Sequence, residues 1–180
     1  MAAFLHVIHP AKNPYDVLMY PIQRHAISEF IPIRNLQYHV RRWGTPPSTP
    51  GLSHAPLVLL HGWMDVAASY QFVVDALSEA FMQGRYIIAP DWRGYGLTQA
   101  KGHDCFWFPD YLADLDCLLD HYAPGQAVDL VGHSMGSLVA LEAAGRASDR
   151  GGRRQVARAH ALVAGRAHLS IKERKHTPCP

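Results

Sequence analysis

The residues that decide the fold are Gly132-His133-Ser134-Met135-Gly136, which join the apolar run AVDLV (127–131) to SLVALEAAGRA (137–147). A short apolar run suits a strand buried on both faces, and the segment after the pentapeptide has a helical composition. A GxSxG at such a junction predicts a nucleophile elbow, in which the serine hydroxyl stands clear of the sheet. The two glycines remove Cβ atoms that would collide with the neighbouring strand and helix. The pattern therefore predicts Ser134 as a nucleophile.

Two more apolar runs upstream predict further buried strands, LVLL (57–60) and YIIAP (86–90). A helix is predicted over residues 69–84, between these strands, and another begins near Pro109. The buried face predicted for the first helix consists of Phe72, Val73, Ala76, Leu77, Ala80 and Phe81. Strands that alternate with helices in this way imply a parallel sheet with right-handed crossovers.

An antiparallel hairpin is predicted to open the domain at residues 25–43, where AISEFIPI and LQYHVRRW flank Arg34-Asn35. The second run alternates apolar and polar residues, as a half-buried strand does. The predicted fold class is α/β, a mostly parallel sheet with helices on both faces and this hairpin at its N-terminal side.

Serine acylation needs two backbone N–H groups directed at the developing oxyanion. One comes from Met135, the residue after the predicted nucleophile. The other is expected from the loop HGWMD (61–65), which directly follows the strand LVLL, and Trp63 holds the matching position. His61 and Gly62 are expected to shape this loop.

The segment DWRGYG (91–96) follows the next strand and contains glycines suited to a tight loop. Asp91 and Arg93 are predicted to form a hydrogen-bonded pair that holds this loop beside the oxyanion turn. We expect a structural role for the pair, because serine chemistry requires no proton transfer there.

HGWMD, DWRGYG and GHSMG, in this order after successive buried strands, resemble the α/β-hydrolase family, and closely its serine-hydrolase-like esterases. The resemblance covers roughly residues 24–146. It implies an α/β-hydrolase fold, Ser134 as nucleophile and oxyanion donors at Trp63 and Met135. Serine in place of aspartate disfavours the dehalogenase and epoxide-hydrolase branches. Gly132, His133 and Gly136 match the elbow, while Ser137 stands where many members have a second glycine.

The resemblance assigns no triad acid or base to this chain, and their locations stay unknown. In the family these residues follow the nucleophile on loops after later strands. Glu142 lies within the helix after the elbow, and Asp149 is only fifteen residues beyond Ser134. None of the remaining downstream candidates matches a family position; they are Glu173, His160, His168 and His176.

A change in composition divides the chain near residue 145. Residues 1–144 contain 8 basic and 13 acidic residues, and residues 145–180 contain 9 basic and 2 acidic ones. All 18 aromatic residues lie at or before Tyr122. The expected organisation is an N-terminal extension (1–23), the N-terminal part of a hydrolase domain (24–146) and a basic tail (147–180), disordered or not native to the family. We accordingly expect a fold incomplete at its C-terminus, from truncation or a disrupted reading frame.

Composition excludes several other classes of function. The net charge of +2 gives no reason to expect binding to nucleic acid or to an anionic membrane. Three cysteines without a CxxC pair suit a reducing compartment, so a cytoplasmic location is expected. The twelve histidines form no metal-binding pattern, and no metal or organic cofactor is expected. The sequence does not indicate an oligomeric state.

The function that these residues indicate is a serine hydrolase of a small-molecule ester or amide, with little activity in this chain because acid and histidine are missing. The alternative is a non-catalytic α/β-hydrolase-like protein that binds a ligand or partner. The same motifs would be present in both. Esterase, amidase, perhydrolase and carbon–carbon hydrolase chemistries are not separated by the sequence.

Overall fold

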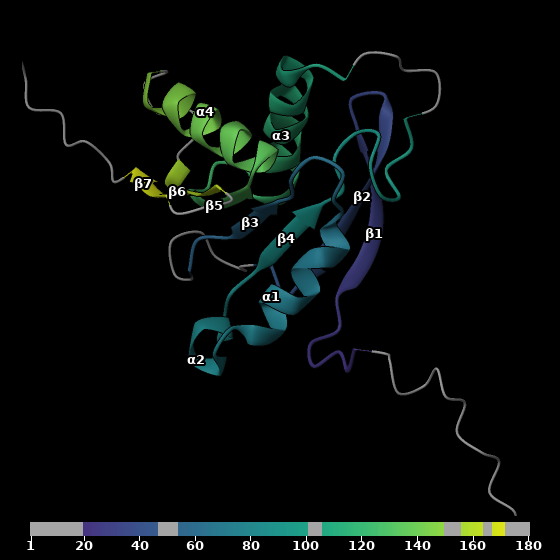
Figure 1. The fold of residues 1–180 in the computed structure, drawn as a ribbon, viewed down its shortest axis with the longest axis vertical. Helices are drawn as coiled ribbons and strands as arrows, with labels where there is room; N and C mark the ends of the chain where they lie inside the picture. The colour runs from purple at the N-terminus through teal and green to yellow at the C-terminus, as the bar shows by residue number, and fades with distance from the viewer. Residues whose placement is uncertain (1–19, 47–53, 101–105, 150–155, 164–166, 172–180) are drawn as a thin grey trace, which may run out of the picture.

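The computed structural model describes residues 20–46, 54–100, 106–149, 156–163 and 167–171. Its seven-stranded sheet has the order β1-β2-β4-β3-β5-β6-β7, and helices lie on both of its faces (Figure 1). The strands are β1 (Ile27–Ile33), β2 (Leu36–Trp43), β3 (Leu57–Leu60), β4 (Ile87–Pro90), β5 (Val128–His133), β6 (Val156–Val163) and β7 (Ala167–Ile171). The helices are η2 (Ala67–Ser69), α1 (Tyr70–Ala76), α2 (Glu79–Met82), α3 (Phe108–Tyr122) and α4 (Met135–Asp149).

The central strands β4, β3, β5 and β6 run parallel, as the alternation of strands and helices predicts. The predicted hairpin is confirmed: β1 and β2 are antiparallel, and Arg34 at their turn has φ 56°. β2 joins the parallel strands by antiparallel pairing with β4. The carboxyl ends of β3, β4 and β5 therefore lie at one edge of the sheet, where the three sequence motifs begin.

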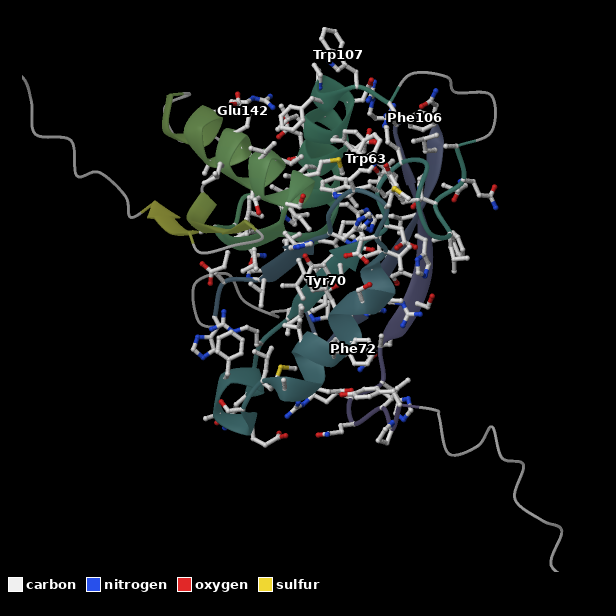
Figure 2. The ribbon with its side chains drawn as sticks, viewed as in Figure 1. Trp63, Tyr70, Phe72, Phe106, Trp107 and Glu142 are labelled. Carbon is white, nitrogen blue, oxygen red and sulfur yellow. The ribbon has the colours of Figure 1, made fainter. Side chains whose placement is uncertain are left out.

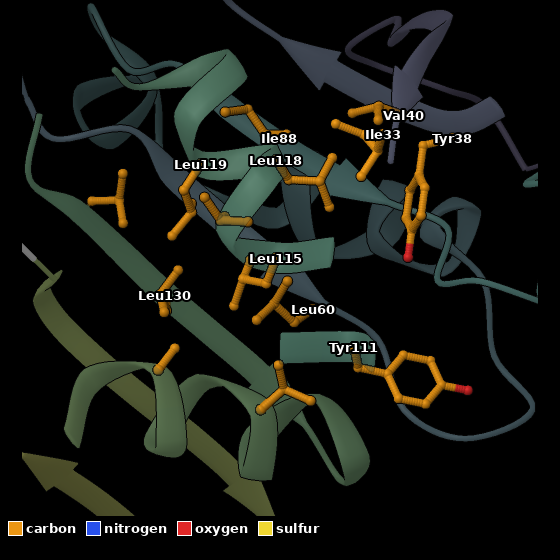
Figure 3. Packing of buried hydrophobic residues seen from close by; sticks show 14 of the residues in the cluster. Ile33, Tyr38, Val40, Leu60, Ile88, Tyr111, Leu115, Leu118, Leu119 and Leu130 are labelled. Carbon is orange, nitrogen blue, oxygen red and sulfur yellow. The ribbon is translucent and has the colours of Figure 1, made fainter. Parts of the chain in front are cut away.

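Two apolar clusters, one on each face of the sheet, form the core. The larger one packs α3 and α4 against the strands, with Leu115, Leu118 and Leu130 at its centre (Figure 3). The smaller one packs α1 against the opposite face and includes Val74 and Ile87. Residues such as Leu60, with no exposed surface, are buried because strands covered on both faces have no side open to water.

The helix predicted over residues 69–84 is in fact two helices. Leu77 is extended, and Ser78 starts α2 by accepting a hydrogen bond from the Phe81 N–H. The predicted buried face is also wrong, because Phe72 and Val73 are exposed. The residues of α1 that are buried are Tyr70, Gln71, Val74 and Asp75.

The polar residues on this buried face bind the segment that precedes β1. Asp75 accepts hydrogen bonds from the backbone N–H groups of Arg24 (2.8 Å) and Gln23 (3.2 Å). Burial opposes charge on Asp75, but these bonds and one from Gln71 lower its pKa below the usual value. The Arg24 guanidinium donates to the carbonyls of Val74 and Asp75, which end α1. Long-range polar contacts thus determine which face of α1 is buried.

The basic segment expected to be a tail contains two strands. β6 pairs parallel to β5, and β7 pairs antiparallel to β6. The expectation of disorder is therefore wrong for residues 156–163 and 167–171. Residues 150–155, 164–166 and 172–180 lie outside the described residues, as do residues 1–19 of the expected extension.

Candidate active site

Ser134 occupies the turn between β5 and α4, and the residue is exposed. Its φ is 51°, in the left-handed region that costs most non-glycine residues about 1–2 kcal/mol. The Ser134 carbonyl accepts hydrogen bonds from the N–H groups of Ser137 (2.9 Å) and Leu138 (3.4 Å), which begin the helix. A strained, exposed serine at a strand-to-helix turn is the geometry predicted from GHSMG.

The elbow glycines are required by space. A Cβ at Gly132 would lie 2.2 Å from the Gly136 carbonyl oxygen, and a Cβ at Gly136 would lie 2.1 Å from that of Leu60. Ser137, which stands where many family members have a second glycine, is buried, and its hydroxyl donates to the Gly132 carbonyl at 2.6 Å. The start of α4 therefore packs directly against the ends of β3 and β5.

The loop after β3 lies beside the elbow. A Cβ at Gly62 would lie 3.2 Å from the Ser134 Cβ and 2.9 Å from the His133 Nδ1. Trp63, the expected oxyanion donor, is the next residue, and Met64 follows with φ 57°. Met135, the other expected donor, is the first residue of α4 and packs partly buried against the larger cluster. The fold thus brings the two segments expected to form the oxyanion hole together.

His61 connects the loops after β3 and β4. Its ring is buried, with Nδ1 2.8 Å from the Gly62 carbonyl oxygen and Nε2 2.9 Å from the Trp92 backbone nitrogen. The carbonyl requires a proton on Nδ1, and the Trp92 N–H requires a lone pair on Nε2, so these contacts suit the neutral ring. Burial lowers the pKa of His61. His61 therefore supports the loop, whereas His133 is exposed.

The predicted pairing of Asp91 with Arg93 is wrong. Asp91 accepts instead from the N–H groups of Ala67 (2.6 Å) and Leu97 (2.9 Å), and its Oδ2 lies 2.7 Å from the His39 Nδ1. The residue at 96 must be glycine, since a Cβ there would lie 2.1 Å from the Asp91 Oδ2. Asp91 therefore holds the loop through Leu97 within it and through Ala67 and His39, which are 24 and 52 residues away in the sequence.

Arg93 pairs with Asp114, near the middle of α3. Its Nε donates to Oδ2 at 2.6 Å and its Nη2 to Oδ1 at 2.8 Å. Asp114 has no exposed surface and also accepts from the Tyr38 hydroxyl at 2.8 Å. The sequence pattern paired Arg93 with Asp91 and assigned no role to Asp114, because the pairing depends on two segments that are 21 residues apart. This pair ties the loop after β4 to α3.

Exposed apolar side chains occur on four segments of the chain, and we call them the apolar rim; Figure 2 shows its members Trp63, Phe106 and Trp107 at the same end of the molecule. Trp63 contacts Tyr95 edge to face, with ring centroids 5.6 Å apart, and the Phe106 ring covers Gly94. The exposed apolar members of the rim are Trp63, Met64, Leu97, Phe106, Trp107 and Leu138. The four segments contain no charged residue; they are 61–64, 94–97, 106–108 and 132–138.

The structure adds no acid or base to Ser134 in the part of the chain whose side chains it describes. Glu142 is exposed on α4 (Figure 2). His160 lies on β6 and His168 on β7, but the described side chains do not include them; Glu173 and His176 lie outside the described residues. Among the described residues, no group of three or more histidine, cysteine or acidic side chains is arranged to hold a metal ion. No described helix is long and apolar enough to cross a bilayer.

A mixed α/β sheet with parallel central strands, and an exposed serine on a strained turn after β5, is typical of the class of α/β-hydrolase folds. A family model described as the alpha/beta hydrolase fold matches residues 55–173. The chain belongs to this family, and the match extends into the basic segment that contains β6 and β7.

Curated relatives support hydrolase activity at the level of the family. The chain is 31% identical over 101 residues to a serine hydrolase-like protein of Dictyostelium discoideum, covering 56% of this chain and 26% of the relative. It is 36% identical over 91 residues to epoxide hydrolase A of Mycobacterium tuberculosis, covering 49% of this chain and 27% of the relative. The matches therefore span about a quarter of the length of these proteins.

Solved structures show the same fold. An epoxide hydrolase from Vigna radiata superposes with a TM-score of 0.58 at 22% identity, over 77% of this chain and 39% of that one. The thioesterase domain from the curacin biosynthetic pathway superposes with a TM-score of 0.57 at 25% identity, over 72% of this chain and 42% of that one.

Proposed function

We propose that this chain is part of a serine hydrolase that attacks an ester-like or amide-like carbonyl through Ser134. The observation that carries the proposal is the exposed Ser134 at φ 51° on the turn after β5. Strain of this kind persists where the surrounding structure enforces it, and it concentrates at functional sites. Because the matches span about a quarter of the curated relatives, the activity of the whole protein is part of this proposal.

In the proposed reaction, the Ser134 Oγ attacks the carbonyl carbon and forms an acyl-enzyme, which water then hydrolyses. The N–H groups of Trp63 and Met135 stabilise the tetrahedral oxyanion. The contact between Gly62 and the elbow supports this assignment, because it holds the loop that carries Trp63 beside the serine. Although epoxide hydrolases occur among the relatives, serine at the nucleophile position favours acyl transfer over epoxide opening.

The apolar rim supports a neutral substrate with an apolar group next to its carbonyl. Its exposed aromatic rings offer area for stacking, and its segments provide no ion to pair with a charged substrate. We also propose a cytoplasmic location, for which the pattern of the three cysteines is the support.

A non-catalytic binding protein is the second candidate. It is favoured by one observation: no described histidine or carboxylate forms a hydrogen bond with the Ser134 hydroxyl. Without a base the serine keeps its proton at neutral pH, and loss of a triad member lowers turnover by up to about 10⁶-fold in known serine hydrolases. We therefore expect slow ester hydrolysis by the 180-residue chain.

Fluorophosphonate labelling followed by peptide mapping tests the two candidates. The hydrolase proposal predicts an adduct on the peptide containing Ser134, absent in Ser134→Ala. It must be unaffected in Ser78→Ala, a control serine at the start of α2. In a full-length relative, replacing the serine that aligns with Ser134 by alanine should abolish turnover of a small activated ester. Retained turnover in that variant would reject Ser134 as the nucleophile, and an unlabelled Ser134 in both proteins would favour the binding protein.

A further inference from the structure

A second serine of this chain already has a histidine and an acid in hydrogen-bonding contact. The Ser28 Oγ on β1 lies 2.6 Å from the His39 Nε2 on β2. The His39 Nδ1 lies 2.7 Å from the Asp91 Oδ2 on the loop after β4. We propose that Ser28, His39 and Asp91 form a second nucleophilic site, which reacts with small electrophilic esters independently of Ser134.

The order of the three groups fits nucleophilic activation. Asp91 and His39 are 2% and 1% exposed, whereas Ser28 is exposed at the surface. The Asp91 carboxylate requires a donor at the His39 Nδ1, so a proton resides there, and in the neutral ring the Nε2 lone pair faces the serine hydroxyl. This is the arrangement in which histidine removes the serine proton and a buried carboxylate stabilises the resulting imidazolium.

The buried acid is held in place from two further sides. Its Oδ1 accepts from the Ala67 N–H at 2.6 Å and its Oδ2 from the Leu97 N–H at 2.9 Å. The histidine is held through its backbone, because the His39 N–H donates to Thr98 Oγ1 at 3.0 Å and its carbonyl accepts from the Asp91 N–H at 2.9 Å. The acid and base thus have fixed positions before any substrate binds.

The surroundings of Ser28 leave room for a substrate. β1 is the edge strand of the sheet, so one side of it has no partner strand among the described residues. The two-residue turn makes Ile33 and Leu36 a hydrogen-bonded pair. Hydrogen-bonded and non-hydrogen-bonded pairs alternate along an antiparallel ladder, so Ser28, five residues before Ile33, is in a non-hydrogen-bonded pair and its N–H points away from β2 to the free side. That N–H is a donor for a developing oxyanion. Phe30 is 51% exposed and its ring centroid lies 5.2 Å from that of His39, which provides an apolar contact.

The proposed reaction with a carboxylic ester balances without a cofactor. The Ser28 Oγ forms a bond to the carbonyl carbon, and its proton passes to the His39 Nε2. The bond from that carbon to the alcohol oxygen breaks, and the alcohol leaves with the proton. Water then attacks the acyl-serine, with His39 again accepting a proton, which releases the acid and restores Ser28. With a fluorophosphonate the serine forms an O–P bond, and fluoride leaves.

The test uses the full 180-residue chain, a small alkyl fluorophosphonate and peptide mapping by mass spectrometry. The proposal expects an adduct on the Ser28 peptide in the unaltered chain and in Ser134→Ala, and none on it in Ser28→Ala. Loss of the base in His39→Gln should slow labelling of Ser28 by at least about 10²-fold. A circular dichroism spectrum establishes that this buried variant is folded, and Ser78→Ala is the surface control.

The experiment tests the proposals for Ser28 and Ser134 independently, because peptide mapping assigns each adduct to its own peptide. An adduct on Ser134 alone, or no adduct at all, overturns the second site. Labelling of Ser28 at the same rate in folded His39→Gln also overturns it, since the serine would then react without its base. Labelling of Ser28 without Ser134 supports the second site, and it contradicts the proposed function when the aligned serine of a full-length relative is also unlabelled.

Discussion

Arg93 and Asp114 form a buried two-point ion pair, with Nε to Oδ2 at 2.6 Å and Nη2 to Oδ1 at 2.8 Å. The pair joins the loop after β4 to α3, and Tyr38 brings β2 into the same contact through its hydroxyl. The loop that carries part of the apolar rim is therefore attached to the core by charge as well as by packing.

Asp114→Asn is expected to destabilise the fold by about 3 kcal/mol, because the buried Arg93 guanidinium loses its two-point partner and keeps the longer contact with the Asp110 Oδ1 at 3.4 Å. The matched control is Asp116→Asn on the same helix. Asp116 pairs with Arg146 at 3.1 Å where both side chains reach solvent, and such pairs contribute about 0–1 kcal/mol. Urea unfolding of both variants measures the difference, and equal losses would contradict the prediction.

Gly136→Ala should destabilise the protein by about 3 kcal/mol, since the new Cβ would lie 2.1 Å from the Leu60 carbonyl oxygen. Gly145→Ala in the same helix has no neighbour within 4 Å of the new Cβ and should stabilise by about 0.5–1 kcal/mol through helix propensity. Thermal melting of the two variants provides the comparison. A tolerated alanine at position 136 would mean that α4 does not pack so closely on β3.

Ser134→Gly is expected to stabilise the chain by about 1 kcal/mol, because glycine adopts φ 51° without the strain of a Cβ. Met64→Gly provides an independent comparison, since Met64 has φ 57° and is 84% exposed, so little packing is lost. Ser134→Ala keeps the strain and should leave the free energy of unfolding almost unchanged. The measurement is chemical denaturation, and a less stable Ser134→Gly would show that the turn is not strained.

The stability of the fold should decrease below about pH 6.5 through His61. Burial lowers its pKa in the folded state below 6.5, so the unfolded chain binds more protons as the pH falls. The free energy of unfolding is therefore unaffected by this group well above pH 6.5 and decreases towards its folded pKa. In His61→Gln, the side-chain oxygen can accept the Trp92 N–H without titrating.

Urea denaturation at pH 7.5 and 5.5 measures how much of the free energy of unfolding each protein loses between these two pH values. The other histidines are common to both proteins, so the unaltered chain should lose more stability on acidification than His61→Gln. The same loss in both would assign the pH dependence to other groups.

Local patterns were enough to predict the hairpin, the parallel strands and the elbow. Each depends on residues close together in the chain: a two-residue turn at Arg34-Asn35, a short apolar run such as LVLL, or glycines flanking Ser134. Their geometry follows from backbone sterics and from burial on both faces of a strand, and neither depends on distant partners.

The predictions that failed concerned polar residues and the sides of helices. Asp75 and Asp114 are buried because they meet Arg24 and Arg93, 51 and 21 residues away in the sequence. The pattern of apolar residues placed Phe72 in the core, but these long-range contacts turn α1 so that it is exposed.

The sequence by itself determined the order of the elements and the position of the strained turn that carries Ser134, because turn sterics and hydrophobic periodicity act over a few residues. The tertiary structure alone decided which charges are buried and which serine meets a histidine. Ser28, His39 and Asp91 come from three segments, and His39 and Asp91 are 52 residues apart. A charge or hydroxyl enters the interior where a partner offsets its lost hydration, and the folded chain determines where that partner lies.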